Sequence, residues 1–573
     1  MNEQFQVSRR QFVQSVAAGS LVSCGSLRHT VADEDAEKPP APRGWVVSDS
    51  LPASEVGAAI LAQGGNAVDA AVATALALAV TFPEAGNLGG GGFMLVRPSD
   101  GSAPVCIDYR ETAPGKATAT MFAKGESRLG HKVVGVPGTP RGLELAHRRY
   151  GKLAWKALVE PAVRLADDGF TLGTRLAADL NKIVASSAEF AELRRVLGKQ
   201  NGAQSWQPDD RLSQPDLART LRQIADDGAA AFYEGPIAEL IVAEMQRGPG
   251  LITRADLAKY QAKLRTPMRG TYRDYEILAA PPPSSGGVAT IEALNLLERF
   301  DLRSHDRWSP RTQHLLVEAL RRAFCDRARW LGDPDFVEVP DHLQSKDYAQ
   351  QLVEAIDLDR ATPSQRLAPE IALPPEGTQT THFSVIDSQG TAVANTYTLE
   401  HSYGSRVMVG GAGFLLNNEM GDFNWQPRVT DRSGQIGTAA NLIAPGKRML
   451  SSQSPTIVLH DGRVELIAGS PGGRTIISTV VCLLVTVLEY GMELRAAVDA
   501  PRLHHGWLPD VVQFEGATEP AYAELIKRLR AMGHAIDDKP HRQGSANSIL
   551  IDSKTGKIDA VADRRRAGAP AAG

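Results

Sequence analysis

A proline-rich segment at residues 359–379 divides the chain into a mainly helical part and a part rich in short strands. The segment has four prolines and little apolar periodicity, which is typical of a linker. Residues 135–265 show helical periodicity, whereas β-branched residues and turn signals alternate after residue 380. Further strand patterns follow the glycine run Gly89–Gly92 and recur at residues 271–280. Helices and strands therefore share one core, which predicts an α/β fold with sheets between helix layers.

The first two strands after the linker, "TTHFSVID" and "TAVANTYTLE", form a predicted hairpin around the turn "DSQG". A turn centred near residue 389 places Thr380 opposite Thr398. Paired threonines are by themselves a common, mildly stabilising cross-strand contact. The linker adds a second interpretation, in which the Thr380 hydroxyl attacks the carbonyl of Gln379 and splits the chain. Thr380 would then carry a free α-amine, whose reference pKa of about 7.7–8.0 suits a general base.

A threonine nucleophile also needs hydrogen-bond donors for the developing oxyanion. The segment "AGSPGGRT" supplies a candidate pair, Gly472 and Gly473, because glycines let backbone N–H groups approach closely. A plain glycine turn explains the same residues equally well. The segment does not match GxSxG, so the sequence does not support the nucleophile turn of an α/β-hydrolase.

Three further motifs carry groups that could hold an amino-acid substrate. The motif "IDYRETAP" places Arg110 at a strand end, where its guanidinium could bind a carboxylate through two hydrogen bonds. The motif "RMLSSQSPT" adds the hydroxyls of Ser451 and Ser452, and "NNEMGDF" offers Glu419 and Asp422 to an ammonium group. A surface ion pair for the arginine and a solvated turn for the acids remain the alternatives at this point.

The N-terminal region has the pattern of an export signal. Arg9 and Arg10 precede a short, weakly hydrophobic stretch, which predicts a twin-arginine signal over residues 1–27, although a disordered basic terminus has the same composition. The run "LVSC" also matches a lipoprotein processing site and leaves a lipid anchor at Cys24 open. Residues 28–43 are charged and contain prolines, as expected of a flexible tether. We therefore expect a periplasmic protein.

Charge and cysteine content exclude several functional classes. The net charge is −4, which argues against nucleic-acid binding because such proteins carry a clustered basic excess. No CxxC pair occurs, so a zinc knuckle or thioredoxin-like motif is unsupported, and Cys106, Cys325 and Cys482 are expected to be buried thiols. The run Gly89–Gly92 leads into a strand rather than a helix, which favours close backbone packing over phosphate binding.

Taken together, the motifs resemble those of the γ-glutamyltranspeptidase family of N-terminal-nucleophile (Ntn) hydrolases. Ordered matches span nearly the whole chain after the signal and include "GGNAVDAAVA", "EAGNLGGGGFML", "DYRETAP", "PPPSSGG", "LGDPDF", "TTHFSVID", "TYTL", "LLNNEM", "LSSQSPTIV", "GSPGG" and "PRLHHGWLPD". The resemblance implies an αββα four-layer sandwich, formed jointly by two autoprocessed subunits, residues 44–379 and 380–573. It implies a heterodimer of these two products and neither a metal nor a cofactor.

The resemblance also assigns roles to the residues singled out above. Thr380 becomes the nucleophile and new N-terminus, Thr398 its activating partner, and the glycine pair the oxyanion hole. The implied reaction transfers a γ-glutamyl group, as from glutathione, through a Thr380 ester to water or to the amine of an amino acid or peptide. The implied substrate contacts are Arg110, Ser451 and Ser452 for the α-carboxylate, and Glu419 and Asp422 for the α-amino group.

Two features depart from the family pattern. Glu400 follows "TYTL" where the family usually has asparagine, so we expect more negative charge around the substrate and a shifted substrate preference. The lid-like segment 424–441 has no tyrosine, and Ser433 stands near its place, which predicts a more open site. Two alternative functions are a cephalosporin-acylase-like Ntn amidohydrolase for a different acyl group, and an exported binding protein without catalysis.

Overall fold

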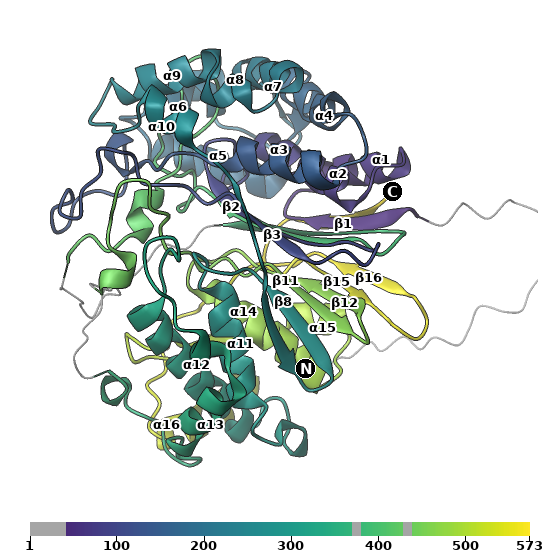
Figure 1. The fold of residues 1–573 in the computed structure, drawn as a ribbon, viewed down its shortest axis with the longest axis vertical. Coiled ribbons are helices and arrows are strands. Elements are labelled where there is room, and N and C mark those ends of the chain that lie inside the picture. Colours follow the sequence, from purple (N-terminus) through teal and green to yellow (C-terminus); the bar gives the residue numbers. More distant parts are fainter. Residues whose placement is uncertain (1–41, 369–379, 428–437) are drawn as a thin grey trace, which may run out of the picture. The chain divides into compact units, whose positions relative to one another are not determined.

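The computed structural model describes residues 42–368, 380–427 and 438–573, which belong to one compact unit, Pro42–Gly573. The predicted signal, almost all of the tether, Cys24, Gln379 and Ser433 lie outside the described residues. Two sheets lie face to face between two layers of helices (Figure 1), so the predicted αββα sandwich is confirmed. Within the described ranges, no helix is long and apolar enough to cross a membrane.

The first sheet has the strand order β17-β1-β9-β10-β2-β3-β6 among the described residues, and each neighbouring pair is antiparallel. Tyr397 pairs with Thr381, so the register continues to Thr380 opposite Thr398 and confirms the predicted hairpin. Strands β1, β6 and β17 were not predicted from the sequence. The strands are β1 (Gly44–Ser48), β2 (Gly91–Arg97), β3 (Val105–Asp108), β6 (Lys263–Arg265), β9 (Thr381–Asp387), β10 (Ala392–Thr398) and β17 (Ala569–Ala572).

The second sheet has the strand order β16-β15-β12-β11-β8-β7, also antiparallel throughout its described strands. Its strands are β7 (Met268–Tyr272), β8 (Tyr275–Ala279), β11 (Thr456–His460), β12 (Arg463–Ala468), β15 (Ser548–Ile551) and β16 (Ile558–Val561). Two short pairs lie outside the main sheets: β4 (Phe170–Thr171) with β5 (Arg211–Leu212), and β13 (Leu503–His504) with β14 (Gln513–Phe514).

Helices cover the outer face of each sheet (Figure 1). The layer on the first sheet contains α1 (Leu51–Ala62), α2 (Ala67–Thr81), α3 (Thr139–Tyr150), α4 (Trp155–Asp167), α5 (Thr174–Ala185), α6 (Ala191–Leu197), α7 (Pro215–Asp227), α8 (Ala230–Tyr233), α9 (Pro236–Met245) and α10 (Arg254–Lys259). The layer on the second sheet contains α11 (Gly286–Leu297), α12 (Pro310–Trp330), α13 (Lys346–Glu354), α14 (Thr475–Leu484), α15 (Leu494–Asp499) and α16 (Ala523–Ala531).

Alternation along β9 decides which side chains lie between the sheets. Phe383 and Val385 pack into the core under the first helix layer, whereas Ile386 packs into the core between the sheets. Thr380, at the start of the strand, shares the parity of Ile386 and therefore points toward the second sheet. The nucleophile candidate thus lies at the end of the double sheet, where loops from both sheets can reach it.

The glycine run Gly89–Gly92 allows backbones to approach closely, as the sequence predicted. A Cβ atom at any of the four would come within 2.4 Å of a carbonyl oxygen of a neighbouring segment. At Gly90 that atom is the carbonyl oxygen of Thr398, at 2.0 Å, and the Nδ2 of Asn87 donates to the same oxygen. The glycines therefore position the end of β10. The cysteine prediction also holds, because Cys106, Cys325 and Cys482 are all buried thiols.

We expect Gly90→Ala to lower the apparent free energy of unfolding by about 1–3 kcal/mol in urea denaturation, because the added methyl overlaps the Thr398 carbonyl. Gly173→Ala is the matched control. A Cβ at Gly173 meets no atom within 4 Å and φ is −77°, so this change should stay within about 0.5 kcal/mol. Equal losses in the two variants would contradict the close approach at Gly90.

His382 is sealed between the sheets. Its Nδ1 lies 2.8 Å from Thr396 Oγ1 and its Nε2 lies 3.1 Å from Ser384 Oγ. Burial lowers the pKa of His382 to about 3, so the ring is neutral at physiological pH. Because this folded-state pKa lies below the ordinary value, its stabilising contribution is present above pH 6.5 and is lost as the pH falls toward 3.

We expect His382→Gln to reduce the slope of stability against pH between pH 6.5 and 4. The wild-type protein should lose up to about 1.4 kcal/mol per pH unit through this residue. Urea denaturation across that range measures the slope, and His305→Gln, at an exposed site, should keep the wild-type value. An unchanged slope in the His382 variant would show that the ring charges without penalty.

Candidate active site

A small cavity at the start of β9 brings nine of the ten predicted site residues together. Its volume is about 30 Å³. Gly472 is the predicted residue that does not line it, although the adjacent Gly473 does. Three lining residues were not predicted: Arg327, Gln453 and Ile476. The predicted members are Thr380, Thr398, Arg110, Glu400, Glu419, Asp422, Ser451, Ser452 and Gly473.

The two threonine hydroxyls face each other across the hairpin. Thr380 Oγ1 donates to Thr398 Oγ1 over 3.4 Å, and Thr398 Oγ1 accepts the backbone N–H of Glu400 at 2.8 Å. Thr380 is 4% exposed and lines the cavity. Because the Glu400 amide occupies one lone pair of Thr398, that hydroxyl is held in place against Thr380. This arrangement suits the activating role that the family resemblance implies for Thr398.

The backbone on either side of Thr380 is also anchored. The guanidinium of Arg566 donates to the Thr380 carbonyl at 3.1 Å, and Thr381 Oγ1 donates to Asp49 at 2.9 Å. Asp49 is completely buried, and burial raises the pKa of its carboxyl, while Arg566 lowers it. Neither Asp49 nor Arg566 was singled out from the sequence, because both come from distant ends of the chain.

The predicted oxyanion loop has a backbone that only glycine adopts readily. Gly472 has φ of 131° and Gly473 has φ of 55°. The hydroxyl of Thr475 donates to the Gly472 carbonyl at 2.8 Å and closes the turn. The turn precedes α14 and places Gly473 on the cavity wall that also contains Thr380. An alanine at either position would strain this turn.

Arg110 is completely buried and forms the centre of the charged wall. Its Nη2 lies 2.7 Å from Glu419 Oε2 and donates to Asp422, and its Nη1 lies 3.5 Å from Glu111. Burial disfavours the charged guanidinium, but the three carboxylates outweigh this effect and raise its pKa. The arginine predicted to hold a carboxylate is therefore paired with the acids predicted to hold an ammonium.

The buried acids of this wall are hard to ionise. Burial raises the pKa of Glu111 to about 8 against the lowering effect of Arg110, and burial also raises the pKa of Glu419 well above its ordinary value. Neither carboxyl oxygen of Glu419 makes a hydrogen bond with another described residue. At neutral pH the site therefore carries less negative charge than its number of carboxyl groups suggests.

The negative charge of Glu400 is partly offset by neighbours that were not predicted from the sequence. Its Oε1 lies 3.1 Å from His401 Nε2 and 3.6 Å from Arg128 Nη1, and Asn418 Nδ2 donates to its other oxygen. Burial raises the pKa of Glu400, whereas His401 and Arg128 lower it. The extra negative charge expected at this position is thus offset in part by Arg128.

The segment "PPPSSGG" positions the serine pair. The backbone N–H and the hydroxyl of Ser285 both donate to the Ser451 carbonyl, at 2.7 and 2.6 Å, and Ser284 Oγ donates to the Gln453 carbonyl. Serine is a common N-cap residue of helices. Ser285 does stand at the start of α11, but its side chain makes no cap hydrogen bond, because it holds Ser451 instead.

Arg327 adds a second guanidinium to the cavity. It comes from the last two turns of α12, donates to Ser452 Oγ at 3.0 Å and donates to Ser285 Oγ at 2.9 Å. No local pattern singles it out, because arginines recur along this amphipathic helix. The carboxylate side of the cavity therefore has two cations, Arg110 and Arg327, beside the serine hydroxyls.

One cluster among the described residues could in principle hold a metal ion. Ligand atoms of His314, Glu318 and His534 lie within 4.8 Å of one another. Burial raises the pKa of Glu318, but Arg321 and Arg322 outweigh it and bring the pKa to about 2. The two guanidiniums already pair with this carboxylate, which makes the cluster unfavourable for a further cation. It lines no part of the Thr380 cavity.

Comparison with known proteins agrees with this geometry. The model of the Gamma-glutamyltranspeptidase family matches residues 53–573. A protein of Escherichia coli (strain K12) described as glutathione hydrolase proenzyme is 41% identical over 97% of each chain. A crystal structure of cephalosporin acylase from Bacillus halodurans is similar at a TM-score of 0.81 and 26% identity, covering 93% of this chain and 96% of that chain.

A crystal structure of Helicobacter pylori γ-glutamyltranspeptidase is 40% identical, with a TM-score of 0.56, over 57% of this chain and 96% of that chain. The family model covers nearly all of the described sequence, and the curated relative matches end to end. The chain belongs to the γ-glutamyltranspeptidase family of Ntn hydrolases.

Proposed function

We propose that this protein is a γ-glutamyltransferase and glutathione hydrolase that cleaves itself before Thr380. The Escherichia coli relative is described as a glutathione hydrolase proenzyme, which supports both the activity and the processing. The observation that carries the proposal is the ion cluster beside Thr380. Arg110 pairs there with Glu419 and Asp422 inside the same cavity as the threonine hydroxyl.

This cluster matches the head group of an α-amino acid. A cavity of about 30 Å³ is close to the space of one water molecule, so a glutamyl group must separate Arg110 from its acids to enter. Its α-carboxylate can then take the place of the acids at Arg110, and its α-ammonium can take the place of Arg110 at Asp422. A ligand with both charges leaves no buried charge without a partner in this exchange. A ligand with one charge would leave either the Arg110 guanidinium or its acids unpaired.

The same hydroxyl serves two reactions. In maturation, Thr380 Oγ attacks the Gln379 carbonyl, the peptide nitrogen becomes the free α-amine of Thr380, and water hydrolyses the resulting ester. In turnover, that amine takes the hydroxyl proton while Oγ attacks the γ-carbonyl of the substrate. The proton passes to the leaving amine, and water or an acceptor amine then cleaves the γ-glutamyl ester. Backbone N–H groups of the Gly472–Gly473 turn are the proposed oxyanion donors.

Thr380→Ala should remain a single chain, because it lacks the hydroxyl that attacks Gln379. Denaturing mass spectrometry of wild-type protein should show a fragment of 194 residues that begins at Thr380. Thr391→Ala is the control, because this hydroxyl bonds Ser99 at the far end of the hairpin, and the variant should still be cut. A wild-type protein that stays whole, or a cut Thr380→Ala chain, would contradict self-cleavage at this bond.

We also propose export through the twin-arginine signal, with Cys24 as the alternative site of a lipid anchor. The mass of the large fragment tests both ideas in the same spectra. A fragment that lacks the first residues supports signal removal, and a large fragment that starts at Cys24 with added acyl mass supports the anchor. A large fragment that still begins at Met1 in secreted material would contradict signal cleavage.

An acylase of the same family is the second candidate function, because the cephalosporin acylase structure has a TM-score of 0.81 to this chain. A glutaryl group has the carboxylate of a glutamyl group but lacks its ammonium. It would leave the carboxylate of Asp422 without a cation once it displaced Asp422 from Arg110. The ion cluster therefore favours γ-glutamyl substrates, and the two candidates differ in one measurable preference.

We expect γ-glutamyl anilides to be hydrolysed with a kcat/KM at least 10-fold above that of glutaryl anilides. Asp422→Asn should lower kcat/KM for the γ-glutamyl substrate by about 10- to 100-fold, the cost of one hydrogen bond to a charged group. It should affect glutaryl turnover far less. Asp226→Asn, in an exposed ion pair with Lys156, should change neither. Equal or better glutaryl turnover by the wild-type protein would favour the acylase.

A further inference from the structure

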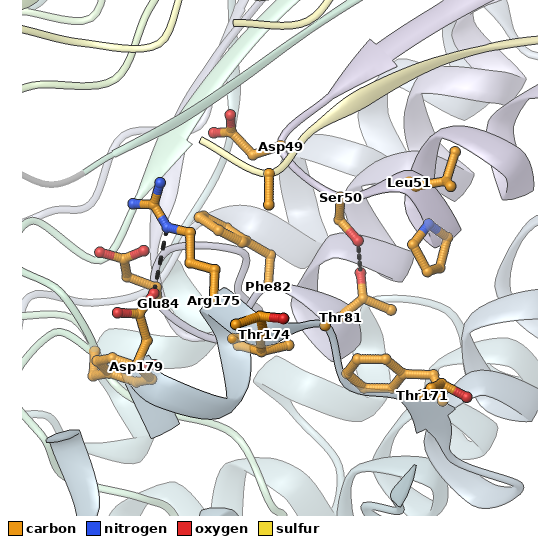
Figure 2. A pocket seen from close by; sticks show the side chains of 16 residues that line it. Asp49, Ser50, Leu51, Thr81, Phe82, Glu84, Thr171, Thr174, Arg175 and Asp179 are labelled. Carbon is orange, nitrogen blue, oxygen red and sulfur yellow. Dashed lines mark hydrogen bonds and ion pairs between the residues drawn. The ribbon is translucent and has the colours of Figure 1, made fainter. Parts of the chain in front are cut away.

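A second, larger cavity lies on the helical side of the first sheet. Its volume is about 420 Å³, which is within the usual range for small-molecule sites. It opens where the first residues of α1 and the end of α2 meet β4 and the first turns of α5 (Figure 2). The mechanism proposed above uses none of its lining residues as substrate contacts. The cavity is therefore a candidate for a separate ligand.

Charge gathers at one end of this cavity. Glu84, Arg175 and Asp179 lie together there, and Leu51 lies at the opposite end (Figure 2). Arg175 Nε is 3.5 Å from Asp179 Oδ2, and Arg175 Nη1 also donates to the Arg565 carbonyl. Burial raises the pKa of Asp179, and Glu84 raises it further. Arg175 and Lys182 lower the pKa of Asp179, whereas the Glu84 carboxylate forms no ion pair with another described residue and accepts only the Ser402 hydroxyl. This end can therefore accept another positive charge at Glu84.

Tyr403 supplies an independent sign that a ligand belongs here. Its side chain lines the cavity and is 3% exposed, and its hydroxyl has no hydrogen-bond partner among the described residues. Glu84, Asp179 and Tyr403 all line the cavity, and the Tyr403 backbone N–H donates to the Glu84 carbonyl at 2.8 Å. Burial raises the pKa of Tyr403, and Glu84 and Asp179 add to the shift. Buried hydroxyls in native proteins are rarely left without a partner. A ligand atom would satisfy this one.

The remaining walls combine apolar residues with the polar Asp49, Ser50 and Thr81. Phe82 and Phe170 contribute rings, and Leu176 and Pro52 add aliphatic surface. We propose that this cavity binds a small amphipathic amine, with its ammonium group between Glu84, Asp179 and the Tyr403 oxygen and its apolar body against Phe82 and Phe170. A primary ammonium has three N–H donors, which matches three acceptor groups at the charged end.

The cavity is also connected to the nucleophile. Asp49 lines it and accepts the hydroxyl of Thr381, the residue next to the nucleophile. The guanidinium of Arg566 lies 5.4 Å from the ring centre of Phe82 and donates to the Thr380 carbonyl. A ligand that packs against Phe82 would therefore contact the ring beside Arg566, and the Arg566 guanidinium holds the Thr380 carbonyl. Binding of the amine should change turnover at Thr380, an effect that rests on the proposed function.

Binding is tested on the wild-type protein by ¹⁹F NMR titration without any γ-glutamyl donor. The probe is 2-(4-fluorophenyl)ethylamine, and its neutral counterpart is 2-(4-fluorophenyl)ethanol. The amine should bind at least 10-fold more tightly than the alcohol. Glu84→Gln and Asp179→Asn should each weaken amine binding at least 10-fold, and Tyr403→Phe about threefold or more.

Glu160→Gln is the matched control. Glu160 forms the same kind of i,i+4 pair with Arg164 on α4 as Asp179 forms with Arg175, but it lies outside the cavity, so amine binding should be unchanged. Thermal unfolding checks that the variants stay folded. Equal binding of amine and alcohol, or amine binding that survives both acid substitutions, would overturn the site. The binding titration measures no turnover, so its result does not depend on the proposed enzyme activity.

The coupling is tested by kcat for a γ-glutamyl anilide with and without the amine. Any acceptor reaction of the amine occurs equally in wild-type protein and in Glu84→Gln, whereas an effect through the cavity occurs only in the wild type. We expect a change in wild-type kcat of at least twofold beyond that of the variant. Identical responses in the two proteins, with binding established, would overturn the coupling and leave only a binding site.

Discussion

The buried ion cluster around Arg110 is the interaction on which the active site depends. A guanidinium without solvent exposure is tolerable only because Glu419, Asp422 and Glu111 surround it, and those acids are tolerable only because of the guanidinium. Such an ion cluster favours ligands that carry both a negative and a positive charge, because these replace the acids and the guanidinium at the same time. The same requirement selects for an α-amino acid head group and against a simple carboxylate. We therefore propose that substrate preference in this protein follows from how this buried charge is neutralised.

The sequence was sufficient for features with a local signal. The short turn after Asp387 determines the register of the hairpin, so the sequence alone is enough to predict the facing hydroxyls of Thr380 and Thr398. The glycine run before β2 could likewise be assigned to backbone packing, because a strand follows it. For Arg110 and the serine pair, the local sequence pattern does not decide a role. The family motifs assigned them to binding the substrate carboxylate.

Features that depend on long-range contact could not be predicted. Arg327 enters the cavity because of how α12 packs, and other arginines on that helix have the same local context. The hydroxyl of Ser284 reaches a carbonyl 169 residues away, so its role as a loop anchor rather than a cap has no sequence signature. Strand β17 has the sequence "APAA", without β-branched residues, and is a strand only because β1 pairs with it.

The order of strands in the first sheet has a consequence for the protein after cleavage. Strands β9, β10 and β17 follow the cleavage site that we propose before Thr380, while β1, β2, β3 and β6 precede it, and β1 lies between β17 and β9. The two products are therefore interleaved by main-chain hydrogen bonds and share both sheets. Once the covalent link is gone, reassembly of unfolded halves is a second-order process that slows with dilution. The cleaved protein therefore depends on folding that took place in the uncut precursor. Its lifetime is set by its unfolding rate, which is kinetic stability, rather than by a folding equilibrium.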